Sequence, residues 1–164
     1  MQNTILRTIL RTSFCALLLA GADALAQERP ALVTRVERAF AEKEPRWKPQ
    51  ERLNGQSGPE LYVLHLKSAQ GDALVYLWLM NSEKTAGEVF EGQTIAFGNG
   101  MGARGRKRRL PDFADENYLW TGFAGSTAAV DFREGGVYVR VIAPSRATAL
   151  RFARHVLRQI NEEP

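Results

Sequence analysis

One tight turn constrains the fold of this chain more than any other feature of its sequence. Arg133-Glu134-Gly135-Gly136 lies between two runs rich in β-branched and aromatic residues, 127–132 and 137–143. Paired glycines between such runs predict an antiparallel hairpin, because glycine readily adopts the positive φ angles of a two-residue turn. The domain must therefore contain an antiparallel sheet.

A helix is predicted directly after this hairpin. Ser145 follows Pro144 and is a suitable N-cap. Apolar residues then recur at helical spacing over more than three turns, at Ala149, Leu150, Ala153, Val156, Leu157 and Ile160. A helix with one apolar stripe needs a surface to cover, and the sheet provides that surface.

The same patterns predict further elements upstream. They are a helix over 31–43, a polar loop over 50–59, strands over 61–67, 74–79 and 118–123, a short helix over 83–91 that ends at Gly92, and a short strand over 94–97. The strands form hairpins and do not alternate with helices, so we predict an α+β domain. It would hold an antiparallel sheet of about five strands with helices packed mainly on one face. The order of elements also suggests a degenerate ββα duplication.

The first 26 residues predict a secretory signal peptide. Arg7 and Arg11 precede the apolar stretch 13–21, which is too short to span a bilayer, and Ala24-Leu25-Ala26 offers a small-x-small cleavage site. The mature chain, 27–164, would be a single exported domain without a transmembrane segment. The expected location is the periplasm, with secretion as the alternative.

Loss of the signal peptide would remove the single cysteine, Cys15. A mature domain without cysteine excludes disulfides, thiolate chemistry and cysteine-based zinc sites. His65 and His155 are the two histidines of the chain. We therefore predict no metal site and no cofactor.

Positive charge is concentrated in one run of the mature sequence. Five of the six residues from 104 to 109 are cations: Arg104, Arg106, Lys107, Arg108 and Arg109. They fall in a predicted glycine-rich loop over 98–117, and loops of that length are often functional or disordered. The run is therefore a candidate anion-binding element for lipid head groups, lipopolysaccharide phosphates or an acidic protein surface. The other interpretation, which we favour, is a solvated and mobile loop, because charge runs are usually solvated and often disordered.

Two other functions of this loop fail on sequence grounds. Residues 100–105 spell G-x-G-x-x-G, but Pro111 leaves no room for the helix that a dinucleotide site requires. Nucleic-acid binding is also disfavoured, because no aromatic residue stands among the cations to stack on a base.

The strand over 74–79 is apolar on both faces, which is unusual for a sheet with one solvated side. Either the strand is central and covered on both sides, which is the interpretation we favour, or its second face is a surface for a protein partner or a second copy. The candidate partner-binding residues are Tyr76, Trp78 and Trp120.

No set of residues predicts catalysis. Ser126, Asp131 and either histidine could be drawn as a triad, but their spacing matches no known arrangement. The simpler interpretation of His65 is a half-buried strand residue, and that of His155 is a surface residue of the last helix. Asp112, Asp115 and Glu116 are expected to offset neighbouring arginines. We predict that the chain is not an enzyme.

Three segments carry a resemblance: Asp115-Glu116-Asn117-Tyr118, the hairpin over 130–141 with Phe132-Arg133-Glu134-Gly135, and the Ala- and Leu-rich helix over 147–157. Together they resemble uncharacterised exported bacterial domains with a DEA-type strand start, an FR-x-G hairpin and a similar last helix. The resemblance implies a non-catalytic envelope interaction or accessory module. The alternatives are a binder of anionic ligands or membrane surfaces acting through 98–109, and a small hydrolase.

Overall fold

The computed structural model describes residues 30–50, 55–58, 60–101, 105–123 and 127–162. The predicted signal peptide over 1–26 lies outside these residues, as do Arg104 and Ser126. No helix in the described part is long and apolar enough to cross a membrane.

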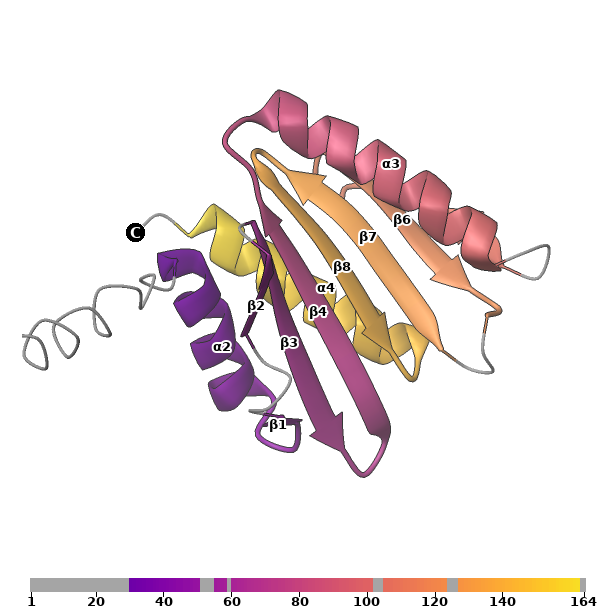
Figure 1. Cartoon of the computed structure of the whole chain (residues 1–164). Helices are drawn as coiled ribbons and strands as arrows, with labels where there is room; N and C mark the ends of the chain where they lie inside the picture. The colour runs from indigo at the N-terminus through magenta and orange to yellow at the C-terminus, as the bar shows by residue number, and fades with distance from the viewer. Residues whose placement is uncertain (1–29, 51–54, 59, 102–104, 124–126, 163–164) are drawn as a thin grey trace, which may run out of the picture. The chain divides into compact units, whose positions relative to one another are not determined.

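The described strands form a single antiparallel sheet (Figure 1). Seven strands follow one another in the order β1-β3-β4-β8-β7-β6-β5, and β2 also pairs with β3. Their bounds are β1 Lys48–Pro49, β2 Gly55–Gly58, β3 Leu61–Ser68, β4 Gly71–Leu79, β5 Arg106–Arg108, β6 Glu116–Thr121, β7 Ala128–Glu134 and β8 Val137–Ala143. The α+β class and the antiparallel sheet are confirmed, but the prediction of about five strands is wrong. The additional strands β1, β2 and β5 have two to four residues each, too few to show an alternating pattern.

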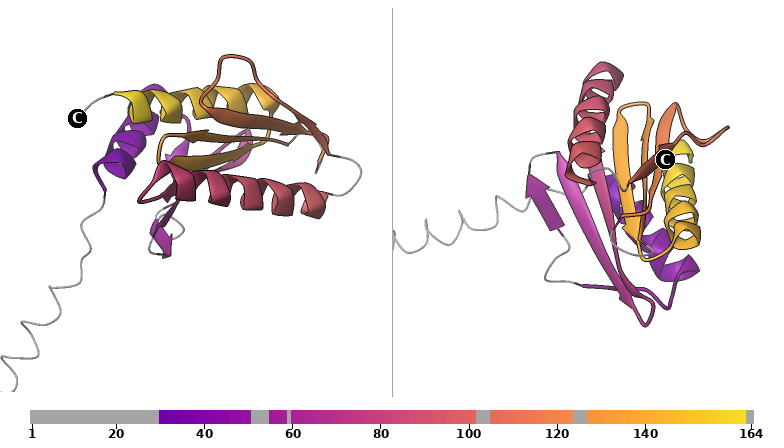
Figure 2. Two further views of the ribbon diagram at one scale, coloured as in Figure 1. Left: turned by 90° about the horizontal axis from the view of Figure 1, so that it is seen from above. Right: turned by 90° about the vertical axis from the view of Figure 1, so that its right-hand side faces the viewer.

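Three helices cover the two faces of this sheet. They are α2 Ala31–Lys43, α3 Glu83–Met101 and α4 Arg146–Asn161. Helices α2 and α4 lie together on one face, and α3 lies on the opposite face over β7 and β8 (Figure 2). Two helices on one face agree with the prediction, whereas α3 adds a layer on the other side.

The main core lies between the sheet and the pair α2 and α4. Strand residues that point to this side are buried, because every second residue of a strand faces the same way. Phe152 of α4 packs edge-on against Phe40, with ring centroids 4.8 Å apart, and against Trp47 at 5.1 Å. The fully buried strand residues around them include Val75, Leu77, Val130, Phe132, Val139 and Val141.

Two tight hairpins set the register of the central strands. Glu134 pairs with Val137 around Gly135, whose φ is +53°, as the glycine pair predicts. Ser68 pairs with Gly71, whose φ of +119° also suits glycine. The hydroxyl of Ser145 accepts a hydrogen bond from the backbone N–H of Thr148, which confirms the predicted N-cap of α4.

Helix α3 corrects two predictions. The short helix over 83–91 does not end at Gly92, and the segment 94–97 is not a strand, because one helix runs through both. A glycine inside a helix costs only about 1 kcal/mol relative to alanine. Phe90, Thr94 and Phe97 recur at helical spacing, and contacts of Phe90 and Phe97 with the sheet outweigh that cost.

The predicted loop over 98–117 is also corrected. It begins inside α3, contains the edge strand β5 and ends in β6. Between β5 and β6, Leu110 and Phe113 enter the core, and Phe113 packs edge-on against Phe132 at 5.3 Å. Apolar side chains therefore anchor the connection from β5 to β6 in the core, so this segment is not simply a solvated loop.

Candidate functional site

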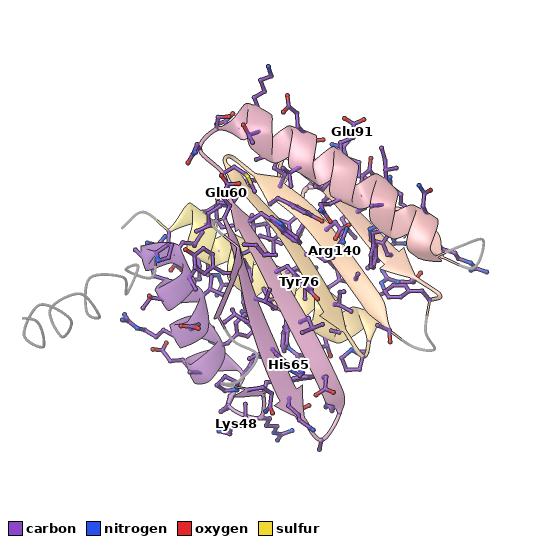
Figure 3. The ribbon with its side chains drawn as sticks, in the orientation of Figure 1. Lys48, Glu60, His65, Tyr76, Glu91 and Arg140 are labelled. Carbon is purple, nitrogen blue, oxygen red and sulfur yellow. The ribbon has the colours of Figure 1, made fainter. Side chains whose placement is uncertain are left out.

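Helix α3 covers only part of its face of the sheet. It contacts β7 and β8, whereas the neighbouring strands β3 and β4 extend beyond it without a helix above them (Figure 1). Tyr76 and His65 lie on these uncovered strands, and Arg140 lies next to α3 (Figure 3). One sheet face is thus divided into a covered and an uncovered part.

The uncovered part is apolar, and we call it the open face. Its residues are all half-buried: Leu61, Val63, His65, Leu74, Tyr76, Trp78 and Ile142. Six alternate residues of the same two strands point to the main core and are buried, at 6% exposure or less: Tyr62, Leu64, Leu66, Ala73, Val75 and Leu77. The doubly apolar strand of the sequence is therefore core on one side only.

Aromatic rings link the open face to the space beneath α3. Tyr76 stacks on Trp78 with centroids 5.6 Å apart, and Trp78 stacks on Tyr138 at 4.5 Å. Tyr138 is fully buried and meets Phe90 of α3 edge-on at 5.6 Å. The open face therefore rests on a rigid support.

A buried ion pair lies beneath α3. Asp131 is fully buried and accepts hydrogen bonds from Arg140 at 2.7 and 2.9 Å and from the indole N–H of Trp120 at 3.0 Å. Arg140 also donates to the carbonyl of Gln93 in α3 at 3.0 Å and lies 4.0 Å from the ring centre of Phe97. The pair thus joins β7, β8 and α3.

Burial shifts the titration of this cluster. It raises the pKa of the Asp131 carboxyl, against the opposing effects of Arg140 and Trp120. Burial, together with the charge of Asp131, also raises the pKa of the Tyr138 hydroxyl above its ordinary value of 10.0. Asp131 thus bonds to Arg140 and Trp120, which are not members of the triad that could be drawn from the sequence.

The three predicted partner-binding residues do not form one surface. Tyr76 and Trp78 belong to the open face, whereas Trp120 lies beneath α3 and is 5% exposed. A Cβ atom added to Gly98 of α3 would lie 3.1 Å from the Trp120 ring, which shows how closely the helix approaches.

The basic run occupies both faces of β5. Lys107 pairs with Trp120 on the α3 side, where its ammonium lies 3.5 Å from the ring centre of Tyr118. Arg106 and Arg108 face the other side, because Arg108 pairs with the core residue Leu119. Arg109 donates a hydrogen bond to the carbonyl of Asp115 at 3.4 Å. The four described cations are exposed, but they do not point in one direction.

Each of the two histidines lies near a carboxylate, and the two pairs are in different parts of the structure. Nε2 of His155 lies 3.1 Å from Glu44, and the His155 side chain is only 15% exposed, so the prediction of a surface residue is wrong. Sequence reasoning missed Glu44, because it lies 111 positions away. Nε2 of His65 lies 3.4 Å from Asp72. Within the residues that the structure describes, no three His, Cys, Asp or Glu side chains are placed to hold a metal ion.

The predicted acidic cluster is partly explained by ion pairs. Arg133 lies 3.1 Å from Asp115 and 2.8 Å from Glu116, so these two acids offset a neighbouring arginine as expected. The arginine comes from the hairpin, however, and not from the basic run.

Comparison with known proteins adds little. No protein-family model and no curated protein matches the chain. A solved structure described as a GTP binding regulator, from Thermotoga maritima, is similar over 80% of this chain and 90% of its own length. It has 13% sequence identity and a TM-score of 0.47. A similarity at this level does not bear on function.

Proposed function

We propose that this chain is an exported, non-catalytic binding module that holds a partner protein on its open face. The observation that carries the proposal is the half-buried aromatic surface of β3 and β4 beside α3. Contiguous apolar surface of this kind, supported by rigid rings, is typical of protein interaction sites.

The width of the open face indicates what the partner presents. Two adjacent strands span about 10 Å, since strands in a sheet lie about 4.8 Å apart. Packed helices are also separated by about 8–10 Å. One amphipathic helix of the partner would therefore fit on β3 and β4 alongside α3 and complete that layer.

Site-specific photocrosslinking in the envelope tests the proposal. A crosslinking residue at Tyr76 should yield a discrete adduct with one partner. The same residue at Ile95, which is 55% exposed on α3, is the matched control and should not. Trp78→Arg should abolish the Tyr76 adduct while the protein remains folded. An adduct that persists in Trp78→Arg would exclude the open face, and an adduct between two copies would identify a homodimer.

A second function is supported by the exposure of the basic run. Arg106, Lys107, Arg108 and Arg109 are all accessible on or beside an edge strand. Near an anionic membrane each cation contributes about 1 kcal/mol. Replacing all four with serine should then weaken co-sedimentation with anionic vesicles by several hundredfold, and salt should weaken the binding of the unmodified protein. No binding at low salt would end this alternative.

A further inference from the structure

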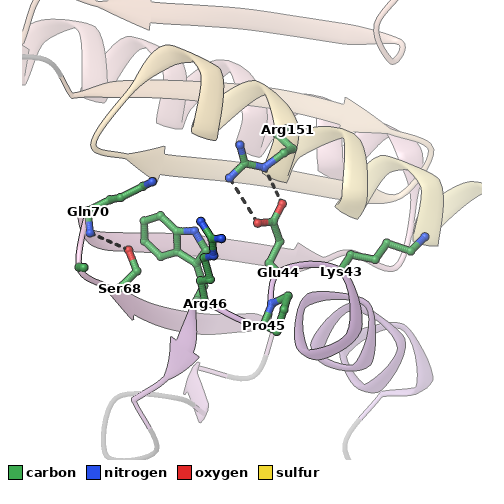
Figure 4. A pocket seen from close by; sticks show the side chains of 9 residues that line it. Lys43, Glu44, Pro45, Arg46, Ser68, Gln70 and Arg151 are labelled. Atoms are coloured by element: carbon green, nitrogen blue, oxygen red, sulfur yellow. Dashed lines mark hydrogen bonds and ion pairs between the residues drawn. The ribbon is translucent and has the colours of Figure 1, made fainter.

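A pocket of about 520 Å³ lies away from the open face, where three segments of the chain meet (Figure 4). These are the connection from α2 to β1, the turn between β3 and β4, and helix α4. Three cations line the pocket, Lys43, Arg46 and Arg151, together with a single carboxylate, that of Glu44. Positive charge is therefore in excess.

The Glu44 carboxylate in this pocket already has partners within the protein. Arg151 donates to Glu44 at 2.5 and 3.3 Å, and His155 approaches it at 3.1 Å. The Glu44 side chain is only 10% exposed, whereas that of Arg151 is 45% exposed. Glu44 thus holds the Arg151 guanidinium in place, while Lys43 and Arg46 are exposed in the same lining.

The rest of the lining combines an apolar wall with a fixed polar turn. Trp47 is held against Phe152 and only 3% exposed, so the exposed apolar surface of the lining comes mainly from its neighbours Pro45 and Ala69. In the same lining, the backbone N–H of Gln70 donates to the Ser68 hydroxyl at 3.0 Å, which orders the turn. A wall of this kind suits the apolar part of a ligand.

We propose that this pocket binds a small organic anion. Its oxyanion group, a carboxylate or a phosphate, pairs with Arg46 and Arg151, and its apolar part lies against the wall formed by Pro45, Ala69 and the edge of Trp47. Guanidinium groups match the geometry of such oxyanions and form strong charge-assisted hydrogen bonds with them. Lys43 adds attraction from the end of α2. This site is independent of the open face and of the basic run.

Titration of the purified protein with phenyl phosphate, followed by NMR, tests the proposal. Saturable shifts are expected at the Trp47 indole and the Gln70 amide, and the affinity should fall as salt rises. Inorganic phosphate, which lacks the apolar part, should bind more weakly. The double variant Lys43→Ser/Arg46→Ser should raise the Kd about tenfold or more, since two charged partners are lost.

A matched control separates this site from general charge attraction. Arg154→Ser/Arg158→Ser removes the same net charge from exposed positions of α4 outside the pocket lining and should leave the Kd unchanged. Equal weakening by the two double variants would overturn the proposal. So would the absence of saturable shifts at Trp47 and Gln70, or shifts confined to residues 106–109. Thermal unfolding checks that each variant is folded, and none of these outcomes depends on the open face.

Discussion

Trp78 and Tyr138 lie opposite each other on β4 and β8, with ring centroids 4.5 Å apart and planes inclined by 17°. Trp78 is half-buried on the open face, whereas Tyr138 is fully buried and contacts α3. A partner that covers Trp78 would therefore contact an aromatic row that continues into the core. This continuity distinguishes the open face from isolated apolar residues on a surface.

Two glycines of α3 should respond oppositely to alanine. At Gly92 an added Cβ meets open space, so Gly92→Ala should stabilise the domain by about 0.5–1 kcal/mol, the usual gain in a helix. At Gly98 the Cβ would press on Trp120, which its bond to Asp131 holds in place, so Gly98→Ala should destabilise the domain by about 1–3 kcal/mol. Urea unfolding of both variants measures the difference. Equal effects would mean that α3 does not pack as described.

Removing one partner of the buried ion pair should destabilise the domain strongly, whereas replacing both partners with apolar residues should change its stability much less. Asp131→Ala leaves Arg140 buried without its partner, so a loss of about 3–5 kcal/mol in unfolding free energy is expected. The double variant Asp131→Leu/Arg140→Met removes both charges and should recover most of this loss. Equilibrium unfolding in urea decides the matter. A single variant as stable as the wild type would show that solvent reaches Arg140.

Tyr138 should make the domain sensitive to alkali. Because its pKa is raised, the folded chain keeps the hydroxyl proton above pH 10, where the unfolded chain releases it. The folded state then binds more protons, so stability falls as pH rises beyond this value. Tyr138→Phe lacks this contribution. Its unfolding free energy relative to that of the wild type should therefore increase between about pH 8 and about pH 11. The urea unfolding midpoints of both proteins at the two pH values test this prediction. If the midpoints of the two proteins fall by the same amount, Tyr138 is not the cause of the alkaline destabilisation.

Export remains a prediction that one mass measurement can check. Cleavage between Ala26 and Gln27 is expected, because the Ala24-Leu25-Ala26 site directly follows the apolar stretch. The intact mass of protein recovered from the envelope should correspond to residues 27–164. A mass that includes residues 1–26 would refute the processed, exported form.

The parts of the fold that the sequence predicts are those decided by local chemistry. Ser145 and Gly135 each suffice to place a cap or a turn, because their preferred geometry depends on a few neighbours. The ion pair of Asp131 and Arg140 could also have been predicted from the sequence. Once the turn at Gly135 is fixed, strand pairing places these two residues opposite each other.

Other features depend on contacts that no local pattern reveals. Gly92 is a plausible helix end by sequence, but contacts made beyond it, such as the packing of Phe97 on Trp120 and the bond from Arg140 to Gln93, extend α3 past it. The pairing of Glu44 with Arg151 and His155 joins the end of α2 to α4, across separations of 107 and 111 positions in the sequence. The position of α3 on the sheet likewise decides whether β4 is covered on both faces, and no local pattern predicts that position.

The outer strands β5 and β1 of the sheet are poorly suited to pairing with the sheet of a second molecule. The outermost strand at one side is Arg106–Arg108, with three consecutive cations, and β1 at the other side is Lys48–Pro49. Like charges repel a second strand at β5, and Pro49 has no N–H to offer one at β1, so neither of these two strands favours pairing between the sheets of two molecules. The cations of β5 would therefore disfavour edge-to-edge association of two sheets, whether or not they bind an anion.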